Sequence, residues 1–144
     1  MNDRKLNLIL GWICFLISFI VYYLTAEPTV GFWDTGEYIT TSAKLQVGHP
    51  PGAPLYQMLG AIFSIFAFEK ENIGFIMNLM SGFTSALAIS FMYWSIILIL
   101  KKITDTSKAS INKQILISGS ALVGSLAFAF TDTFWFSAVE TEVY

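Results

Sequence analysis

The sequence predicts an all-α membrane protein with three transmembrane helices and further helices lying at the outer membrane face. Of its 144 residues, 55% are hydrophobic and only 12% are charged, whereas about 25% of residues are charged in ordinary soluble domains. The apolar residues form long stretches without any charge, and several lysines lie next to the ends of these stretches. Both observations are typical of helices that cross a bilayer.

Residues 6–25 form the first expected span. No charged residue occurs from 6 to 24, and at about 1.5 Å per residue this run covers roughly 28 Å, close to the thickness of the hydrocarbon core. A secretory signal peptide is the alternative, but signal peptides have apolar runs of about 7–15 residues and a small-residue cleavage site, which is not evident here. Because Arg4 and Lys5 precede the run, its start is expected in the cytoplasm.

Residues 26–72 have a different composition, with all four prolines and with two lysines against five acidic residues. Such a segment is expected on the outer face, which is poor in Lys and Arg. A helix over 34–47 is expected to lie at the interface and to end near Gly48 and Pro50, since proline cannot donate a backbone hydrogen bond. Residues 53–68 are apolar over a length that suits either a short span or an interfacial helix.

The basic loop at 101–113 decides between these two possibilities. It carries four lysines against one aspartate, so it is expected in the cytoplasm, between spans at 73–100 and 114–136. If the first span leaves the cytoplasm and the second returns to it, 53–68 must stay on the outer side as a juxtamembrane helix. Three spans without a closing element indicate that residues 1–144 are the N-terminal part of one longer membrane domain.

Several classes of function are disfavoured by the sequence. The net charge of −2 implies neither a nucleic-acid partner nor a polybasic lipid anchor. No Gly-rich phosphate loop, no Gly-x-Ser-x-Gly motif and no dinucleotide fingerprint occurs, so no cofactor is expected. Acidic residues that face outward above a membrane bundle favour a substrate that resides in the bilayer.

Asp34 and Glu37 are the first candidates for chemistry. Their spacing places them on one face of a helix, and it also fits a capping box, in which the two side chains bond to backbone amides at the helix start. Alternatively, the pKa of a carboxyl group partly desolvated beside Trp33 can rise toward the range of a general base. The two interpretations are compatible, because a cap fixes the position of a carboxylate.

His49 is the only histidine of the chain, and the two prolines that follow it restrict its backbone. No second histidine is available for a zinc site. Hard oxygen ligands for another metal ion exist in Asp34, Glu37 and Glu140, but we expect no metal. Glu140 and Glu142 are expected on the same outer face as Asp34, where a solvated acidic loop is the simplest alternative to a functional role.

Three motifs resemble a large bacterial family of multi-pass membrane proteins that was catalogued as a domain of unknown function. The motifs are Phe32-Trp33-Asp34-Thr35-Gly36-Glu37-Tyr38, Val47-Gly48-His49-Pro50-Pro51-Gly52-Ala53-Pro54-Leu55 and Phe134-Trp135-Phe136-Ser137-Ala138-Val139-Glu140-Thr141-Glu142-Val143-Tyr144. That family is similar to animal protein O-mannosyltransferases and belongs with the GT-C glycosyltransferases. The resemblance covers nearly the whole chain, and members of the family are much longer.

The resemblance implies a membrane glycosyltransferase that moves a sugar, most simply mannose, from a polyprenyl-phosphate donor to Ser or Thr of an exported protein. It further implies a location in the bacterial inner membrane with the active face in the periplasm. Asp34 would be the base, and Glu37 would help to position the acceptor or a cation. The remaining site residues would line the pocket or contact the sugar: His49, Glu140, Glu142 and Tyr144. The O-mannosyltransferases proper commonly have two adjacent acids, whereas Thr35 and Gly36 separate them here, so the division of roles between the two acids stays open.

A non-catalytic membrane scaffold, or a subunit that binds polyprenyl lipid, is the alternative to an enzyme. A transporter would be expected to place ionisable groups near the middle of the bilayer, in broken helices. In this sequence every Asp, Glu, Lys and Arg lies at or beyond the end of an expected span, which disfavours transport. A scaffold would tolerate a neutral residue at position 34.

Overall fold

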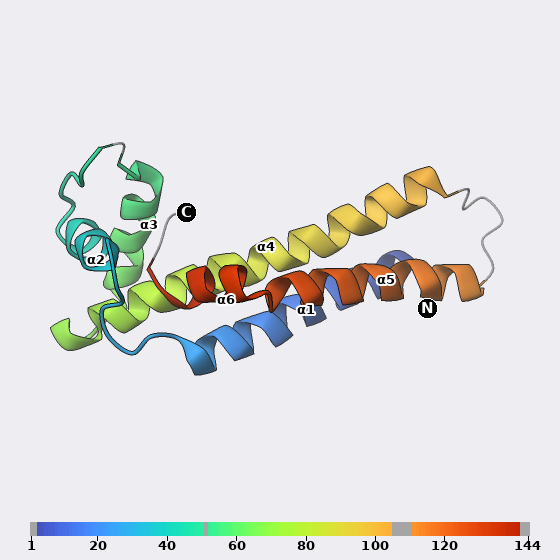
Figure 1. The fold of residues 1–144 in the computed structure, drawn as a ribbon, viewed down its shortest axis with the longest axis horizontal. Helices are drawn as coiled ribbons and strands as arrows, with labels where there is room; N and C mark the ends of the chain where they lie inside the picture. Colours follow the sequence, from blue (N-terminus) through green and yellow to red (C-terminus); the bar gives the residue numbers. More distant parts are fainter. Residues whose placement is uncertain (1–2, 51, 105–110, 142–144) are drawn as a thin grey trace. The chain divides into compact units, whose positions relative to one another are not determined.

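The computed structural model describes residues 3–50, 52–104 and 111–141, and this part of the chain contains helices but no strand. The prediction of an all-α membrane protein is therefore confirmed. Two helices are long and apolar enough to cross a membrane, or up to three if an interrupted pair counts as one span. The α-helices, in chain order (Figure 1), are α1 (Asp3–Thr25), α2 (Thr35–Ala43), α3 (Pro54–Ser64), α4 (Ile73–Ile103), α5 (Ile111–Ala129) and α6 (Asp132–Val139).

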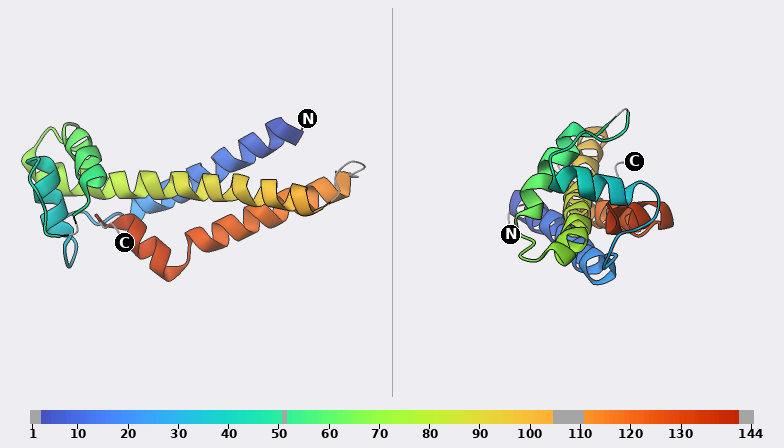
Figure 2. Two further views of the ribbon diagram at one scale, coloured as in Figure 1. Left: turned by 90° about the horizontal axis from the view of Figure 1, so that it is seen from above. Right: turned by 90° about the vertical axis from the view of Figure 1, so that its left-hand side faces the viewer.

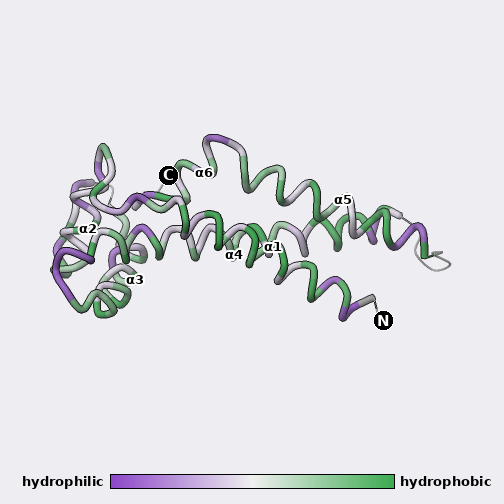
Figure 3. Tube along the Cα trace, turned by 90° about the horizontal axis from the view of Figure 1, so that it is seen from below, coloured by the Kyte–Doolittle hydropathy of each residue, from purple (hydrophilic) through white to green (hydrophobic). Residues whose placement is uncertain are grey.

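Hydropathy separates the long helices from the short ones. The trace is mainly hydrophobic along α1, α4 and α5, and hydrophilic positions gather at α2 and in the loops next to it (Figure 3). The helices α2 and α3 have 9 and 11 residues, which gives them lengths of about 14 and 17 Å. Neither is long enough to cross a hydrocarbon core of about 30 Å.

The chain divides into two compact units, and α1 and α4 contribute to both. The first unit consists of Met1–Ile20 and Ser85–Thr131. Its interior is organised around buried Asn7, whose Oδ1 accepts hydrogen bonds from the hydroxyl groups of Tyr93 at 3.2 Å and Ser118 at 2.9 Å. The indole of Trp94 donates to the backbone oxygen of Asn7 at 3.1 Å. These bonds satisfy polar groups that lipid could not.

The second unit consists of Val21–Thr84 and Asp132–Tyr144, and within it α2 and α3 lie side by side near the start of α4 (Figure 2). Its apolar core is formed by Ile39 of α2 with Met77 and Met80 of α4. Gly60 of α3 allows close packing, because a Cβ atom at this position would lie 2.8 Å from the Cβ of Ser42 and 2.5 Å from the Cε of Met77. The absence of a side chain at Gly60 therefore sets how closely α3 can approach α2.

The third span differs from the sequence prediction. An unbroken helix was expected over 114–136, but α5 ends at Ala129 and α6 begins at Asp132. The backbone amide of Thr131 donates to the Phe128 carbonyl at 3.1 Å, and the Thr131 hydroxyl donates to the same carbonyl at 2.8 Å. These bonds close the end of α5, and the acidic Asp132 suits the positive end of a new helix. Hydropathy alone does not report such a break, because α6 is itself apolar.

Candidate active site

Asp34 occupies the position immediately before α2. Its backbone carbonyl accepts the amides of Glu37 at 2.9 Å and Tyr38 at 3.0 Å, so the helix begins where the capping-box pattern predicts. Its carboxylate, however, makes no side-chain capping bond. The capping-box interpretation is therefore right about the position of Asp34 and wrong about its side chain.

The carboxylate of Glu37 binds His49 instead. Its Oε1 accepts the backbone amide of His49 at 2.7 Å, and its Oε2 lies 2.9 Å from His49 Nδ1. Because an ionised carboxylate only accepts hydrogen bonds, Nδ1 must carry a proton. The side chains are partly exposed, at 38% for Glu37 and 44% for His49. This pair fixes the His49 loop against the first turn of α2.

The same pair shifts the acid–base properties of both groups. The hydrogen bond from the His49 backbone amide, followed by the bond from its ring, lowers the pKa of Glu37 below 4.5. The hydrogen bond and the charge of Glu37 raise the pKa of His49 above 6.5, and the charge of Asp34 adds to this effect. The second ring nitrogen of His49, Nε2, lies 3.9 Å from Asp34 Oδ2. The imidazole of His49 therefore lies between two carboxylates, which favour its charged form.

The backbone at Trp33 brings Asp34 to this position. Trp33 has a φ of 57°, which is unusual for a residue with a side chain and costs of the order of 1 kcal/mol. Trp33 is 89% exposed. Next to it, the hydroxyl of Thr35 donates to the Phe32 carbonyl at 2.7 Å and stabilises the turn. Residues held in such sparsely populated backbone conformations cluster at functional sites.

Glu140 lies in the same unit, against the loop that leads to Asp34. A Cβ atom at Gly31 would lie 2.5 Å from Glu140 Oε2, so any side chain at position 31 would have to displace the Glu140 carboxylate. Nearby, the Glu27 amide donates to the Val139 carbonyl at 3.1 Å. Glu140 is only 6% exposed, so the alternative of a solvated acidic loop is wrong for this residue. The other two residues expected here, Glu142 and Tyr144, lie outside the described residues.

Asn78 holds this loop in place through hydrogen bonds. This residue was not among the candidates predicted from the sequence. It is fully buried, its amide nitrogen donates to the carbonyls of Glu27 at 2.7 Å and Thr29 at 2.9 Å, and its oxygen accepts the hydroxyl of Thr141 at 2.6 Å. One side chain thus joins the segment before Asp34 to the end of the third motif. An amide within the uncharged 73–100 stretch was the signal that could have revealed it.

Tyr56 is a second polar group inside this unit that sequence reasoning missed. Its hydroxyl lies 3.0 Å from the hydroxyl of Ser81, and burial raises the pKa of Tyr56 above its ordinary value of 10.0. The ring of Tyr38, next to Glu37, packs edge-on against that of Tyr56 with centroids 5.8 Å apart. The aromatic pair therefore gives α2 a rigid support beneath its acidic first turn.

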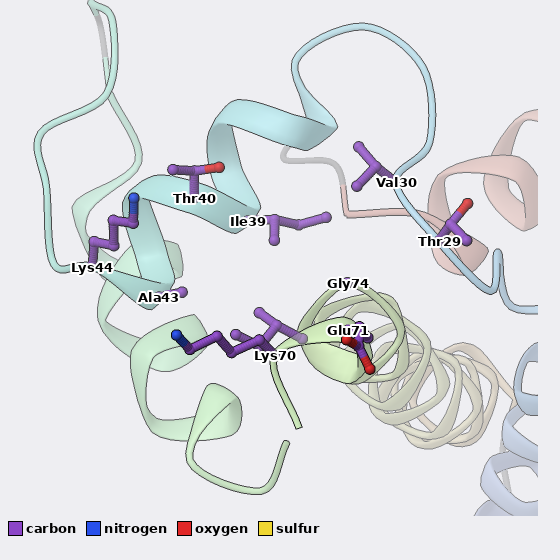
Figure 4. A pocket seen from close by; sticks show the side chains of 10 residues that line it. Thr29, Val30, Ile39, Thr40, Ala43, Lys44, Lys70, Glu71 and Gly74 are labelled. Atoms are coloured by element: carbon purple, nitrogen blue, oxygen red, sulfur yellow. The ribbon is translucent and has the colours of Figure 1, made fainter. Parts of the chain in front are cut away.

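A cavity of about 300 Å³ lies beside α2, and two of its lining residues are lysines. Figure 4 shows Lys44 at the end of α2 and Lys70 ahead of the start of α4, together with Thr29, Thr40 and Glu71. These are the two lysines of the segment 26–72. Asp34, Glu37 and His49 do not line this cavity.

The metal alternative requires oxygen ligands that converge on one point. In the described ranges, no three side chains of His, Cys, Asp or Glu are grouped closely enough to hold a metal ion. Asp34 and Glu37 face His49, and Glu140 lies against Gly31. The structure thus gathers Asp34, Glu37 and His49 and places Glu140 separately.

The chain has helices able to cross a membrane, and one of its units contains an acid–histidine cluster. Together these features define a membrane protein with a candidate catalytic centre. Residues 34–144 match the family described as the protein O-mannosyl-transferase TMEM260 N-terminal domain. The chain belongs to this family, and its resemblance to O-mannosyltransferases is thereby confirmed. The matched region begins at Asp34 and includes Glu37, His49 and Glu140.

Two curated relatives carry the same name. The chain is 28% identical over 131 residues to the protein O-mannosyl-transferase tmem260 of Dictyostelium discoideum, covering 90% of this chain and 14% of that protein. It is 28% identical over 127 residues to the protein O-mannosyl-transferase TMEM260 of Mus musculus, covering 86% of this chain and 15% of that protein. The chain thus spans about one seventh of the length of these relatives. No solved structure matches the chain.

Proposed function

We propose that this chain is the N-terminal part of a GT-C type membrane glycosyltransferase. The complete protein transfers a sugar, mannose in the simplest case, from a polyprenyl-phosphate donor to Ser or Thr of an exported protein, in the bacterial inner membrane with the site on the periplasmic face. Membership of the TMEM260 N-terminal family supports the reaction class. The observation that carries the proposal for the site is the position of Asp34 at the start of α2, beside His49.

The contacts of the two acids support a different role for each. Glu37 accepts two hydrogen bonds from His49, and its lowered pKa makes it a weak base. Asp34 Oδ2 lies 3.9 Å from His49 Nε2. Because Glu37 is engaged with His49 through both of its oxygens, we assign the general base to Asp34, and Glu37 becomes a positioning residue that holds His49.

The transfer proceeds as one inverting displacement. The carboxylate of Asp34 removes the proton from the Ser or Thr hydroxyl, and the oxygen forms a bond to the anomeric carbon of the sugar. The bond from that carbon to the phosphate oxygen breaks, and its electron pair leaves with the polyprenyl phosphate. Asp34 ends protonated, and the glycosylated protein and the lipid phosphate are the products.

The leaving phosphate requires a cation or hydrogen-bond donors. His49, whose raised pKa favours its charged form, lies beside Asp34. Lys44 and Lys70 both line the cavity next to α2. The chain spans about one seventh of the length of its curated relatives, and we assign the remaining stabilisation to the rest of the proposed full-length enzyme. The chain alone should then be inactive.

The test uses the full-length protein in membranes, with transfer of labelled mannose from polyprenyl-phosphate mannose to exported protein as the readout. Asp34→Asn keeps size and polarity but removes the base, so transfer should fall at least 100-fold. Asp132→Asn is the matched control, since Asp132 is also an acid at the start of a helix in the same unit. It should leave transfer within about twofold.

The outcomes separate the candidate functions. Loss of transfer with normal membrane accumulation of Asp34→Asn supports the assignment of the base. Unchanged transfer in Asp34→Asn would show that the base lies elsewhere. If the unmutated protein transfers no sugar from any donor offered, the non-catalytic scaffold or the polyprenyl-lipid-binding subunit replaces the enzyme.

A further inference from the structure

The first unit contains a cavity that the proposed reaction does not use. Its volume is about 400 Å³, within the range of small-molecule sites. All of its lining residues come from the first turns of α1 and the last turns of α4, and they are Arg4, Asn7, Leu8, Trp94, Ile97, Leu98 and Lys101. The active-site candidates belong to the other unit.

Charge and hydropathy are ordered along this cavity. On α1, Arg4 precedes Leu8 by one turn, and on α4, Lys101 follows Leu98 by one turn, so each helix contributes one face. Both cations lie at the terminal ends of helices that are long and apolar enough to cross a membrane. The apolar residues lie deeper, and Leu8 is 53% and Leu98 69% exposed. The cavity is therefore cationic at the membrane surface and apolar within the bilayer.

The floor of the cavity is fixed by hydrogen bonds. Asn7 is buried and accepts the hydroxyl groups of Tyr93 and Ser118. The indole of Trp94 donates to the Asn7 backbone at 3.1 Å, which holds its ring against α1. Asn7 and Trp94 are thus held in place, so a ligand would lose little binding energy in ordering this part of the cavity.

We propose that this cavity binds one anionic phospholipid, with its phosphate between Arg4 and Lys101 and an acyl chain along Leu8, Trp94 and Leu98. The charge complementarity and the order of polar and apolar groups both match a phospholipid that lies upright in its leaflet. Basic cavities between transmembrane helices commonly hold anionic lipid headgroups. The positive-inside rule places this end in the cytoplasmic leaflet, where anionic lipids attract juxtamembrane cations.

The test measures lipid binding to the full-length protein in detergent by native mass spectrometry, with phosphatidylglycerol and phosphatidylcholine of identical acyl chains. Phosphatidylglycerol should bind more tightly. The double variant Arg4→Gln/Lys101→Gln should weaken it about 25-fold, at about fivefold for each cation. The matched control is Lys5→Gln/Lys102→Gln, which removes the same net charge from the same helix turns at exposed residues that do not line the cavity. It should change binding less than about threefold.

Four results would overturn the proposal. The first is equal binding of the two lipids, and the second is equal weakening by the two double variants, which would indicate only a general surface charge. The third is competition by free glycerol 3-phosphate as strong as that by phosphatidylglycerol, which would show that the apolar wall plays no part. A cavity covered by other helices of the whole protein would give unchanged lipid binding in Arg4→Gln/Lys101→Gln, and this result also refutes the site. Because the readout is lipid binding, it is independent of sugar transfer.

Discussion

Glu37 holds His49 by two atoms at once, with its Oε1 at 2.7 Å from the His49 backbone nitrogen and its Oε2 at 2.9 Å from Nδ1. The bond to the backbone fixes the loop, and the bond to the ring fixes both the ring orientation and the position of its proton. The Nε2 atom is then directed toward Asp34, at 3.9 Å. Two residues twelve positions apart in the sequence thus form one rigid unit beside the candidate base.

The first prediction concerns the protonation of His49. The pKa of His49 should lie above 6.5 in the unmodified protein, because Glu37 and Asp34 both favour its charged form. In Glu37→Gln the pKa should fall toward 6.5, since the largest cause of the shift is removed. NMR titration of histidine-labelled protein measures it, with the His49 signal identified by its loss in His49→Gln. Glu69→Gln, at an exposed acid of the same unit, should leave the titration unchanged.

The second prediction concerns the pH range in which the His49 loop is held. Because the pKa of Glu37 is lowered, the stabilisation that its carboxylate gives to the His49 loop is complete above pH 4.5. It is lost as the pH falls through the lowered pKa. Because the pKa of His49 is raised, the stabilisation that the charged imidazole gives to the loop is complete below pH 6.5. It is lost as the pH rises through the raised pKa. The hydrogen-exchange protection of the His49 amide, corrected for intrinsic exchange, should therefore be greatest between these limits. A protection that follows the same pH dependence in Glu37→Gln would argue against the pair as its cause.

The third prediction concerns packing at Gly60. Alanine there would place a Cβ atom 2.8 Å from Ser42 Cβ, and overpacking of this kind typically costs about 1–3 kcal/mol. The midpoint of thermal unfolding in detergent should fall. Gly119→Ala is the control, because nothing lies within 4 Å of a Cβ atom there and alanine favours a helix by up to about 1 kcal/mol. If both variants behave alike, the close packing of α3 on α2 is not what Gly60 provides.

The fourth prediction concerns Asn78. Asn78→Leu would leave the carbonyls of Glu27 and Thr29 without their buried donor, and an unsatisfied buried polar group costs about 1–3 kcal/mol. The unfolding midpoint should fall, and sugar transfer should fall with it, because the loop that carries Asp34 loses its support. The exposed Asn112→Ala should alter neither quantity. Full activity in a destabilised Asn78→Leu protein would mean that the loop is held in place by other contacts.

Local patterns in the sequence carried the prediction of the fold class. A helix that crosses a bilayer must be apolar over its length, because lipid offers no hydrogen bonds, so α1 and α4 are visible as uncharged runs. The start of α2 at Asp34 could also be predicted, since helix starts depend on neighbouring residues. The interruption after Ala129 could not, because it depends on the bonds of Thr131 to a carbonyl rather than on hydropathy.

The sequence by itself determined that this protein is an all-α membrane protein and which residue types its three motifs offer for chemistry, because both depend on composition and local spacing. Only the tertiary structure decided which of those residues meet. The spacing of Asp34 and Glu37 favoured a capping box. In the folded chain, Glu37 instead forms hydrogen bonds with His49, and Glu140 is buried against Gly31. Such pairings join different segments of the chain. The partner of a carboxylate therefore depends on which residues the packing of the helices brings close to it, and not on its neighbours in the sequence.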